Sequence, residues 1–416
     1  MRLTKGGTSA SDMVLVGAGA FIARCLYWAL VTPTWRPNSD ADQYVLLARA
    51  MADGHGYSLI YPQLQMHATA FRPPLYPMAL VPAAFLTHGL WTARLTNVLL
   101  GTAVVVLVYV IAGRIAGRAA GLAAGAIAAI YPPLLANDTV TLSEPLSLVL
   151  LFAIVLLVDD RRWVWAGVAC GALMLTRPNA YLVVATVAVV ALIKAGWRPA
   201  IRLLVVAALI TVPWIIRNEI QVGTPELVTS DGFTLAAVFA EPAQNRNGFV
   251  DPVFDSAYAN DLDLKLSQFD ESVWSNKLLH RAWDGVRSNP RYVITNARRN
   301  VADLLELSGR NDGPERLDGR NIDFRHATLP LFYVVTVAGI AGLWLHRRDW
   351  RVRLLAVLAA EFAILMILIL APPRLRAPVD VICCIGVGLL VSSLWRRYRT
   401  REQREPDRIL VAARNV

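Results

Sequence analysis

Acidic side chains lie where long apolar runs of this sequence end. Asp40 and Asp42, in the stretch SDADQYVLLARAMADGHGYS, follow an apolar run long enough to cross a membrane. Asp138 and Glu144, in the stretch NDTVTLSEP, stand at a similar boundary. A carboxylate in such a place can accept a proton from a hydroxyl group and so act as a general base. The sequence therefore offers acid–base chemistry at a membrane boundary.

Arginines are expected at the same boundary, in short linkers where the outer side of a membrane protein usually has few. They are Arg72 in FRPPLYP, Arg177 in TRPN, Arg217 in PWIIRNEI, and Arg374 and Arg376 in PPRLRAP. One such arginine could simply extend from a helix end into the interface. Several together favour a phosphate site, because guanidinium groups match phosphate oxygens. Arginines that hold a phosphate leaving group, beside a carboxylate base, would suit sugar transfer from a lipid phosphate.

Two of the acids also have a purely structural interpretation. Glu144 precedes Pro145 at the start of a predicted helix, where the helix dipole favours an acid. Ser39 and Asp42 have the spacing of a capping box, so Asp42 could serve a helix start. The apolar residues of YVLLARAM predict that this helix lies along the membrane interface.

The composition requires a membrane. Of 416 residues, 56% are hydrophobic and 17% are charged, whereas a soluble chain carries about 25% charged residues. All four cysteines lie in apolar runs, so neither a disulfide nor a metal site is predicted. A short, proline-interrupted segment, 75–86, is expected to be interfacial or re-entrant. About ten spans are predicted, near 13–33, 94–113, 119–136, 144–158, 163–177, 179–194, 202–217, 327–346, 354–371 and 377–395.

The basic linkers MRLTK, GRIAGR, DDRR, KAGWRPAIR and HRRDWRVR, and the tail WRRYRTREQR, fall on one side of this topology. They predict cytoplasmic N- and C-termini, and the net charge of +10 is then an orientation signal rather than a nucleic-acid site. The predicted domains are an N-terminal membrane module 1–217 with an outer loop 34–93, an outer helical segment 218–326, membrane helices 327–395, and a cytoplasmic tail 396–416.

Two further features of the helices can be predicted. In the outer segment, Val273, Leu278, Leu279, Trp283 and Val286 recur at helical spacing and predict an amphipathic helix. Within the membrane, a lone charge is expensive, so the mid-span residues Arg24 and Glu361 are expected to pair with each other or with neutral partners.

The order of the short motifs resembles a known family. They are Asp40 with Tyr44 and the GxGY pattern of Gly54, Gly56 and Tyr57; Arg72-Pro73-Pro74; Glu144; Arg177-Pro178; Pro213-Trp214 with Arg217-Asn218; and Arg374-x-Arg376-x-Pro378. The chain resembles the protein O-mannosyltransferase-like and lipid A aminoarabinose transferase-like glycosyltransferases, which have the GT-C fold.

The resemblance implies an all-α polytopic membrane protein of GT-C type, with amphipathic helices in the first outer loop. It implies an inverting transfer from a polyprenyl-phosphate sugar donor to a hydroxyl of a glycan, lipid or protein. Asp40 takes the position of the base by its spacing to Tyr44, and Asp42 is the second candidate. The five arginines named above, with Tyr44, Tyr57 and Glu144, would bind substrate and phosphate.

The resemblance does not indicate whether the site binds a metal ion. No cofactor is certain and a divalent cation stays open, because Ala41 separates two acids that are adjacent in the common pattern. His55 and His67 of the first loop are expected to be solvated.

Two other classes of function stay open, a lipid-linked sugar transporter or flippase and a non-catalytic subunit of related fold. A transporter would favour repeated halves and site acids at the midplane, whereas no repeat is visible and the candidate site acids lie at the outer edge. The composition, rich in alanine and arginine, is typical of a GC-rich bacterium, so an inner or plasma membrane with the active site outside is expected. The sugar and the acceptor are not indicated.

Overall fold

The structure is a computed structural model that describes residues 8–60, 66–87, 89–253, 255–258, 270–310 and 312–414. Side chains beyond residue 399 lie outside this description. The linker MRLTK and the end of the basic tail therefore lie outside the described residues.

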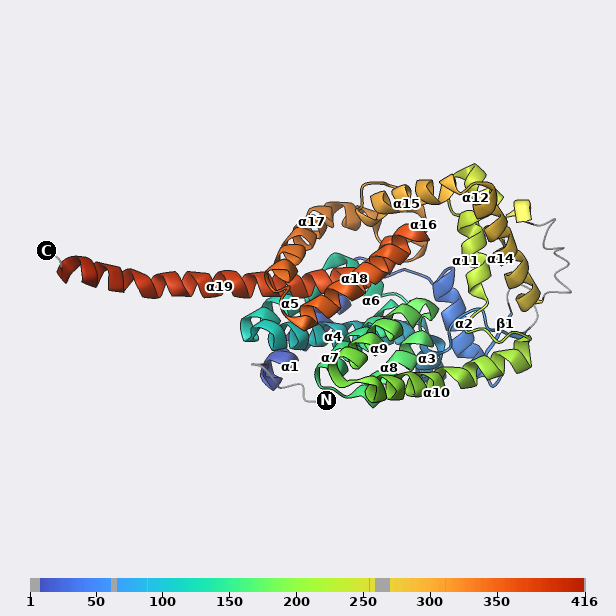
Figure 1. The fold of residues 1–416 in the computed structure, drawn as a ribbon. Helices are drawn as coiled ribbons and strands as arrows, with labels where there is room; N and C mark the ends of the chain where they lie inside the picture. The colour runs from blue at the N-terminus through green and yellow to red at the C-terminus, as the bar shows by residue number, and fades with distance from the viewer. Residues whose placement is uncertain are drawn as a thin grey trace.

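The core is a bundle of apolar helices (Figure 1). By length and hydropathy, six described segments could cross a membrane: α1 (Ala10–Leu30), α4 (Leu90–Ala116), η1 (Pro178–Ala180) with α9 (Tyr181–Ala195), α10 (Trp197–Val222), α17 (Ile322–Leu345), and η4 (Pro373–Arg376) with the first part of α19 (Ala377–Arg414). A seventh results if α5 (Arg118–Ile130) and α6 (Pro132–Asp138), bent by 61°, form one span.

The prediction of about ten spans is thus supported for six or seven. Three further helices occupy predicted spans without meeting the same criterion. The helices α7 (Glu144–Asp159) and α8 (Trp163–Met174) are shorter. The helix α18 (Trp350–Leu368) is long enough but carries Arg351, Arg353 and Glu361.

Small residues allow the closest helix contacts. In α17, Gly339 and Gly342 face Gly386 of α19, and a methyl group added at any of the three would overlap the facing backbone. Such close backbone approach is a common way for membrane helices to associate, because lipid provides no hydrophobic drive for it. α19 also packs on α5, so the last helix connects the N-terminal and C-terminal membrane helices in one bundle.

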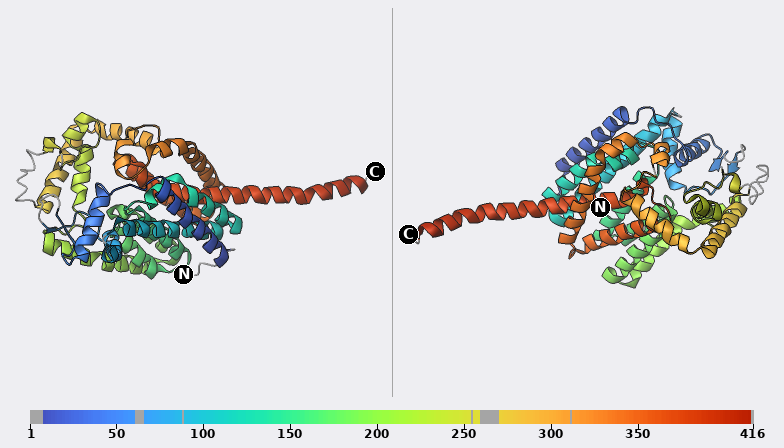
Figure 2. Two further views of the ribbon diagram at one scale, coloured as in Figure 1. Left: turned by 180° about the vertical axis from the view of Figure 1, so that it is seen from behind. Right: turned by 90° about the horizontal axis from the view of Figure 1, so that it is seen from above.

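The remaining elements gather at one end of the bundle, which we call the site end; α19 extends from the opposite end (Figure 2). They are α2 (Asp40–Ala52), β1 (Ser58–Leu59), β2 (His67–Ala68), α3 (Leu75–Thr87), α11 (Ser230–Phe239), α12 (Glu241–Arg246), η2 (Ser256–Tyr258), α14 (Glu271–Ser288), α15 (Arg291–Leu304) and α16 (Asp312–Leu317). The two strands pair antiparallel, so the expectation of a purely α fold needs this small correction.

The amphipathic helix predicted in the segment 218–326 exists as α14, but its buried face differs. Trp274, Leu278 and Ala282 are buried, whereas Val273 and Trp283 are exposed. The prediction placed Trp283 rather than Trp274 on the buried face. Both tryptophans lie near the apolar stripe of the helix, and the contact of α14 with α11 decides that Trp274 is buried.

The buried carboxylate of Glu271, at the start of α14, ties this segment to the first loop. It accepts hydrogen bonds from Thr69 Oγ1 at 2.7 Å and from the backbone N–H of Ala70 at 2.9 Å. A buried charge needs such donors, and here they come from a segment about 200 residues earlier in the chain. The segments 34–93 and 218–326 therefore meet at the site end.

The described basic linkers meet at the opposite end. Arg114 at the end of α4 pairs with Asp159 at the end of α7, at 2.9 Å. Arg118 pairs with Asp12 at 2.6 Å, and Arg351 donates to the carbonyl of Arg114 at 2.8 Å. This arrangement agrees with the prediction that these basic linkers lie on one side of the membrane.

The predicted pairing of the mid-span charges Arg24 and Glu361 is wrong. Arg24 is fully buried and binds Asp138 of α6 through Nε at 2.9 Å and Nη2 at 2.6 Å. Glu361 accepts a hydrogen bond from the hydroxyl of Thr186, a neutral partner, as the alternative expectation allowed. Asp138 was expected at the outer membrane boundary. It is instead the buried counter-ion that compensates the charge of Arg24 inside the bundle.

Candidate functional site

Asp40 is the first residue of α2 and stands at an unusual backbone turn. The preceding residue, Ser39, has a φ of 52°, a left-handed backbone conformation that residues other than glycine rarely adopt. The predicted capping box is therefore wrong: the Ser39 side chain does not cap α2. Local strain of this kind is common where a side chain must be held in one place.

Two arginines from distant segments bind the Asp40 carboxylate. Arg72 Nη2 lies 2.5 Å from Oδ1, and Arg374 Nη2 lies 2.5 Å from Oδ2. Arg72 comes from the segment before α3, and Arg374 comes from η4, 334 residues beyond Asp40. The Asp40 side chain is 20% exposed, so solvent still reaches a carboxylate whose two oxygens both carry a guanidinium.

These contacts set the protonation of Asp40. Burial alone would raise the pKa of its carboxyl group, but the charges of Arg72 and Arg374 outweigh burial and hold the pKa below its usual range. Asp42 is different, since burial raises the pKa of its carboxyl group and Arg49 lowers it only partly. The two acids that looked alike in the sequence therefore have opposite electrostatic environments.

The other predicted acid, Glu144, extends the same group of charges. It is buried at the start of α7, and its Oε1 lies 2.7 Å from Arg177 Nη2 and 4.0 Å from Arg374 Nε. Glu144 thus brings Arg177 next to Arg374.

A further acid, Asp318, was not predicted from the sequence. Its Oδ2 lies 3.2 Å from Arg374 Nε. Burial raises the pKa of the Asp318 carboxyl group, Arg374 lowers it, and the nearby charge of Asp40 raises it further. It belongs to the stretch LDGR in the segment 218–326, where a lone acid beside a glycine carries no motif.

We call these six residues the Asp40 cluster: Arg72, Asp40, Arg374, Asp318, Glu144 and Arg177. Three guanidinium groups and three carboxylates balance formally. A phosphate that entered would compete with the carboxylates for the same arginines. A phosphate that takes the place of a carboxylate on one of these guanidinium groups would release that carboxylate to accept a proton.

The two predicted tyrosines position the cluster. The Tyr57 hydroxyl donates to the carbonyl of Arg72 at 2.8 Å, so it fixes the backbone that carries this arginine. The GxGY pattern before it has a physical reason, because Gly54 and Gly56 have φ values of 83° and 69°. The Tyr44 hydroxyl donates to Ser143 Oγ at 3.4 Å, beside Glu144.

Arg217 lies apart from the Asp40 cluster. Its Nη1 donates to the carbonyl of Thr69 at 2.6 Å and its Nη2 donates to the carbonyl of Tyr57 at 2.9 Å. These contacts fasten the first loop to the end of α10, so the guanidinium is engaged with backbone rather than with Asp40.

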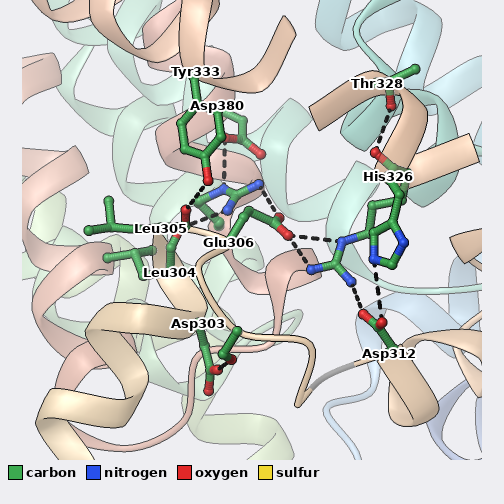
Figure 3. Close-up of polar contacts among 12 residues, drawn as sticks. Asp303, Leu304, Leu305, Glu306, Asp312, His326, Thr328, Tyr333 and Asp380 are labelled. Atoms are coloured by element: carbon green, nitrogen blue, oxygen red, sulfur yellow. Dashed lines mark hydrogen bonds and ion pairs between the residues drawn. The ribbon is translucent and has the colours of Figure 1, made fainter. Parts of the chain in front are cut away.

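Arg376 also does not contact Asp40. It is 2% exposed and binds Asp380 through Nε at 3.0 Å and Glu306 through Nη2 at 2.8 Å. Arg374 and Arg376 are two residues apart in the four-residue η4, and their side chains bind different partners, which residue spacing alone does not reveal. Glu306 and its partners form a separate group (Figure 3).

A divalent cation does not fit the described site residues. Both oxygens of Asp40 bind guanidinium groups, and the described residues contain no group of three His, Cys, Asp or Glu side chains arranged to hold an ion. The chemistry of this site is accordingly derived from its own side chains.

Comparisons with known proteins concern the sequence family and the fold. Residues 72–216 match the sequence model of the family described as dolichyl-phosphate-mannose-protein mannosyltransferase. This confirms the family resemblance seen in the sequence. The match begins at Arg72 and includes Glu144 and Arg177. Among curated protein sequences, none matches the chain.

Two solved structures with TM-scores above 0.5 share the fold of this chain. An oligosaccharyltransferase from Archaeoglobus fulgidus in complex with zinc and sulfate aligns with a TM-score of 0.52 and 16% identity, over 94% of this chain and 50% of that one. The archaeal oligosaccharyltransferase AglB from the same organism, in complex with an inhibitory peptide and a dolichol-phosphate, aligns with a TM-score of 0.52 and 14% identity, over 95% and 51%. The chain thus spans about half the length of these two proteins. ArnT from Cupriavidus metallidurans, bound to undecaprenyl phosphate, aligns with a TM-score of 0.44 and 16% identity, over 92% and 77%.

Proposed function

We propose that this chain, a member of the dolichyl-phosphate-mannose-protein mannosyltransferase family through residues 72–216, transfers a sugar from a polyprenyl-phosphate donor to an acceptor hydroxyl. The observation that carries the proposal is the carboxylate of Asp40, held between Arg72 and Arg374 at 2.5 Å each. A base and a phosphate-binding pair occupy one place, as glycosyl transfer from a lipid phosphate requires.

In the proposed reaction, the donor phosphate binds Arg374 and Arg72 and loosens their contact with Asp40. The pKa of Asp40, held low by these two charges, then rises, so the carboxylate becomes a better proton acceptor. The acceptor hydroxyl loses its proton to Asp40 as its oxygen bonds to the anomeric carbon. The bond from that carbon to the phosphate oxygen breaks, with inversion, and the arginines stabilise the released polyprenyl phosphate.

The proposal includes ten passes, because α7, α8 and α18 also run between the two ends. α7 begins at Glu144 in the Asp40 cluster and ends beside Arg114 at the opposite end. α18 begins beside Arg114, and the carbonyl at its other end, Leu368, accepts a hydrogen bond from Asn296 at the site end. An even number of passes leaves both termini on one side.

We infer the orientation from the basic linkers. They lie at the end opposite Asp40, which supports cytoplasmic termini and an active site on the outer face of a plasma membrane. The boundaries 1–217, 218–326, 327–395 and 396–416 remain the proposed domains. A bacterial source, a multi-pass inner-membrane location and an acceptor among glycans, lipids or proteins belong to the same proposal.

The experiment is turnover of a radiolabelled polyprenyl-phosphate sugar by the purified protein in sealed proteoliposomes. Asp40→Asn is expected to lower kcat by about 10²–10⁴-fold, because the amide cannot accept the proton. Asp42→Asn, the matched control two residues away, is expected to keep activity within a few-fold. Thermal melting of both variants checks the fold. Full activity in a folded Asp40→Asn protein would remove Asp40 from the reaction, and movement of intact donor without turnover would indicate a flippase.

A further inference from the structure

Gln43 lies close to Asp40 on α2, because residues three apart on a helix are neighbours on its surface. Its side-chain carbonyl oxygen, Oε1, accepts a hydrogen bond from Arg72 Nε at 2.6 Å. The same guanidinium binds Asp40 through Nη2 at 2.5 Å. Two residues at the start of α2 therefore hold one arginine, and the proposed reaction so far uses only Asp40.

The two guanidinium groups on Asp40 have different surroundings. Besides Asp40, two further carboxylates lie 3.2 Å and 4.0 Å from Arg374 Nε. Among the described residues, Arg72 forms an ion pair with Asp40 alone, and its Nη1 donates no hydrogen bond. The Arg72 side chain is 17% exposed. Arg72 therefore has fewer competing anions than Arg374 and attracts an incoming phosphate more strongly.

The neutral amide of Gln43 preserves this difference. A carboxylate at residue 43 would cancel the charge of Arg72, and an apolar side chain would leave Nε without its acceptor. The amide fixes the plane of the guanidinium and adds no second negative charge. The rings of Phe71 and Tyr44 support the same orientation, with centroids 4.9 Å and 5.8 Å from Arg72 Cζ.

We propose that Gln43 is a positioning residue that keeps Arg72 in place while the donor phosphate replaces Asp40 on Nη2. When Oδ1 of Asp40 leaves Arg72, Nε keeps its bond to Gln43, so the guanidinium does not follow the carboxylate. The other oxygen of Asp40 can stay on Arg374 during this exchange. The inference rests on the proposed function and assigns the exchange to the Arg72 side of Asp40.

The test measures the affinity of the purified full chain in detergent for a polyprenyl phosphate that carries no sugar. Gln43→Met keeps the length of the side chain and removes the acceptor, whereas Gln43→Glu keeps the acceptor and adds a charge. Arg72→Lys keeps the positive charge but lacks the Nε–H that Gln43 accepts. Gln221→Met is the matched control, because Gln221 is exposed in the last turn of α10. Thermal melting checks that each variant is folded.

Gln43→Met is expected to weaken binding of the polyprenyl phosphate about tenfold, the effect of one hydrogen bond to a charged group. Gln43→Glu is expected to weaken it at least as much, because its charge competes with the phosphate for Arg72. In sugar transfer, Gln43→Met is expected to raise the KM for the donor by a similar factor and to change kcat less than about threefold. Gln221→Met is expected to match the wild type.

The double variant shows whether Gln43 acts through Arg72. In the Arg72→Lys background, Gln43→Met is expected to change the affinity less than about twofold, since the bond that it would remove is already absent. Unchanged affinity in folded Gln43→Met, or the same loss in both backgrounds, would overturn the inference.

Binding and turnover distinguish this inference from the proposed function. Sugar transfer by the wild type, together with unchanged affinity in Gln43→Met, would overturn the role of Gln43 alone. The predicted loss of affinity in Gln43→Met, without sugar transfer by the wild type, would support that role and contradict the proposed transfer. A wild type that binds no polyprenyl phosphate would overturn both.

Discussion

Arg374 is shared by two aspartates whose environments differ. Asp40 also binds Arg72, and its pKa lies below the usual range, whereas burial raises the pKa of Asp318. Two acids on one guanidinium compete for it and for any phosphate that approaches it. Asp318 is therefore proposed to be a positioning residue. By competing for Arg374, it limits how tightly Arg374 can bind the donor phosphate.

Removal of the Asp318 charge tests this competition. Asp318→Asn is expected to lower the KM for the donor severalfold, because Arg374 loses a competing anion, while kcat does not rise. Its raised pKa means that the folded state binds a proton more readily than the unfolded state, so the ionised Asp318 costs stability as the pH rises through and above its unfolded pKa, about 4. The melting temperature of Asp318→Asn should accordingly match or exceed that of the wild type at neutral pH. A higher KM together with a lower melting temperature would contradict this role.

At the scale of elements, the end of α15 places Glu306 where glycine is usual. Glu306 has a φ of 60°, and the backbone N–H of Leu307 bonds to the carbonyl of Ala302, as in a Schellman motif. A left-handed glutamate costs roughly 1 kcal/mol relative to glycine. The ion pairs of Glu306 with Arg325 and Arg376 must outweigh that strain if they hold the end of α15 against η4.

Glu306→Gly separates the two effects, because it relieves the backbone and removes the carboxylate. Breaking a buried pair costs about 3–5 kcal/mol, so a net loss of stability of about 2 kcal/mol or more is expected. A lower melting temperature in detergent would agree, and Glu306→Gln, which keeps the strain, should melt lower still or at the same temperature. A rise in the melting temperature of Glu306→Gly would show that the strain exceeds the value of the pairs.

The positions of the helices could be predicted from the sequence more accurately than their buried faces and their capping residues. Apolar runs located the described spans, because a 20-residue apolar stretch has few alternatives in a membrane. The start of α2 was placed correctly, but the capping role of Ser39 was not, since the residue type of a serine does not indicate a positive φ. In α14, Trp274 rather than Trp283 is buried because α11 covers it.

At the scale of the molecule, contacts between distant segments limited the prediction of the site. The motifs around Asp40, Arg72, Glu144 and Arg177 were recognised because the family pattern orders them. The 2.5 Å contact between Asp40 and Arg374 spans 334 residues, and no local pattern reveals it. The same holds for Arg24, whose partner Asp138 lies 114 residues away and not in the expected helix.

The inferred orientation can be tested by cysteine labelling in intact cells. Asn276→Cys, on exposed α14 at the site end, is expected to react with a membrane-impermeant maleimide from outside. Arg348→Cys, exposed in the linker at the opposite end, is expected to react only after permeabilisation. The native cysteines give little background, because three are buried and Cys25 is partly buried. The reverse pattern would place Asp40 on the cytoplasmic side.

The most direct test of the account is a structure of the full chain with a polyprenyl phosphate bound. In the proposed reaction, the phosphate oxygens lie within hydrogen-bond distance of Arg374 and Arg72, and at least one oxygen of Asp40 is released from its guanidinium and open to an acceptor hydroxyl. A phosphate bound away from these arginines, with both Asp40 contacts still at their present 2.5 Å, would contradict it.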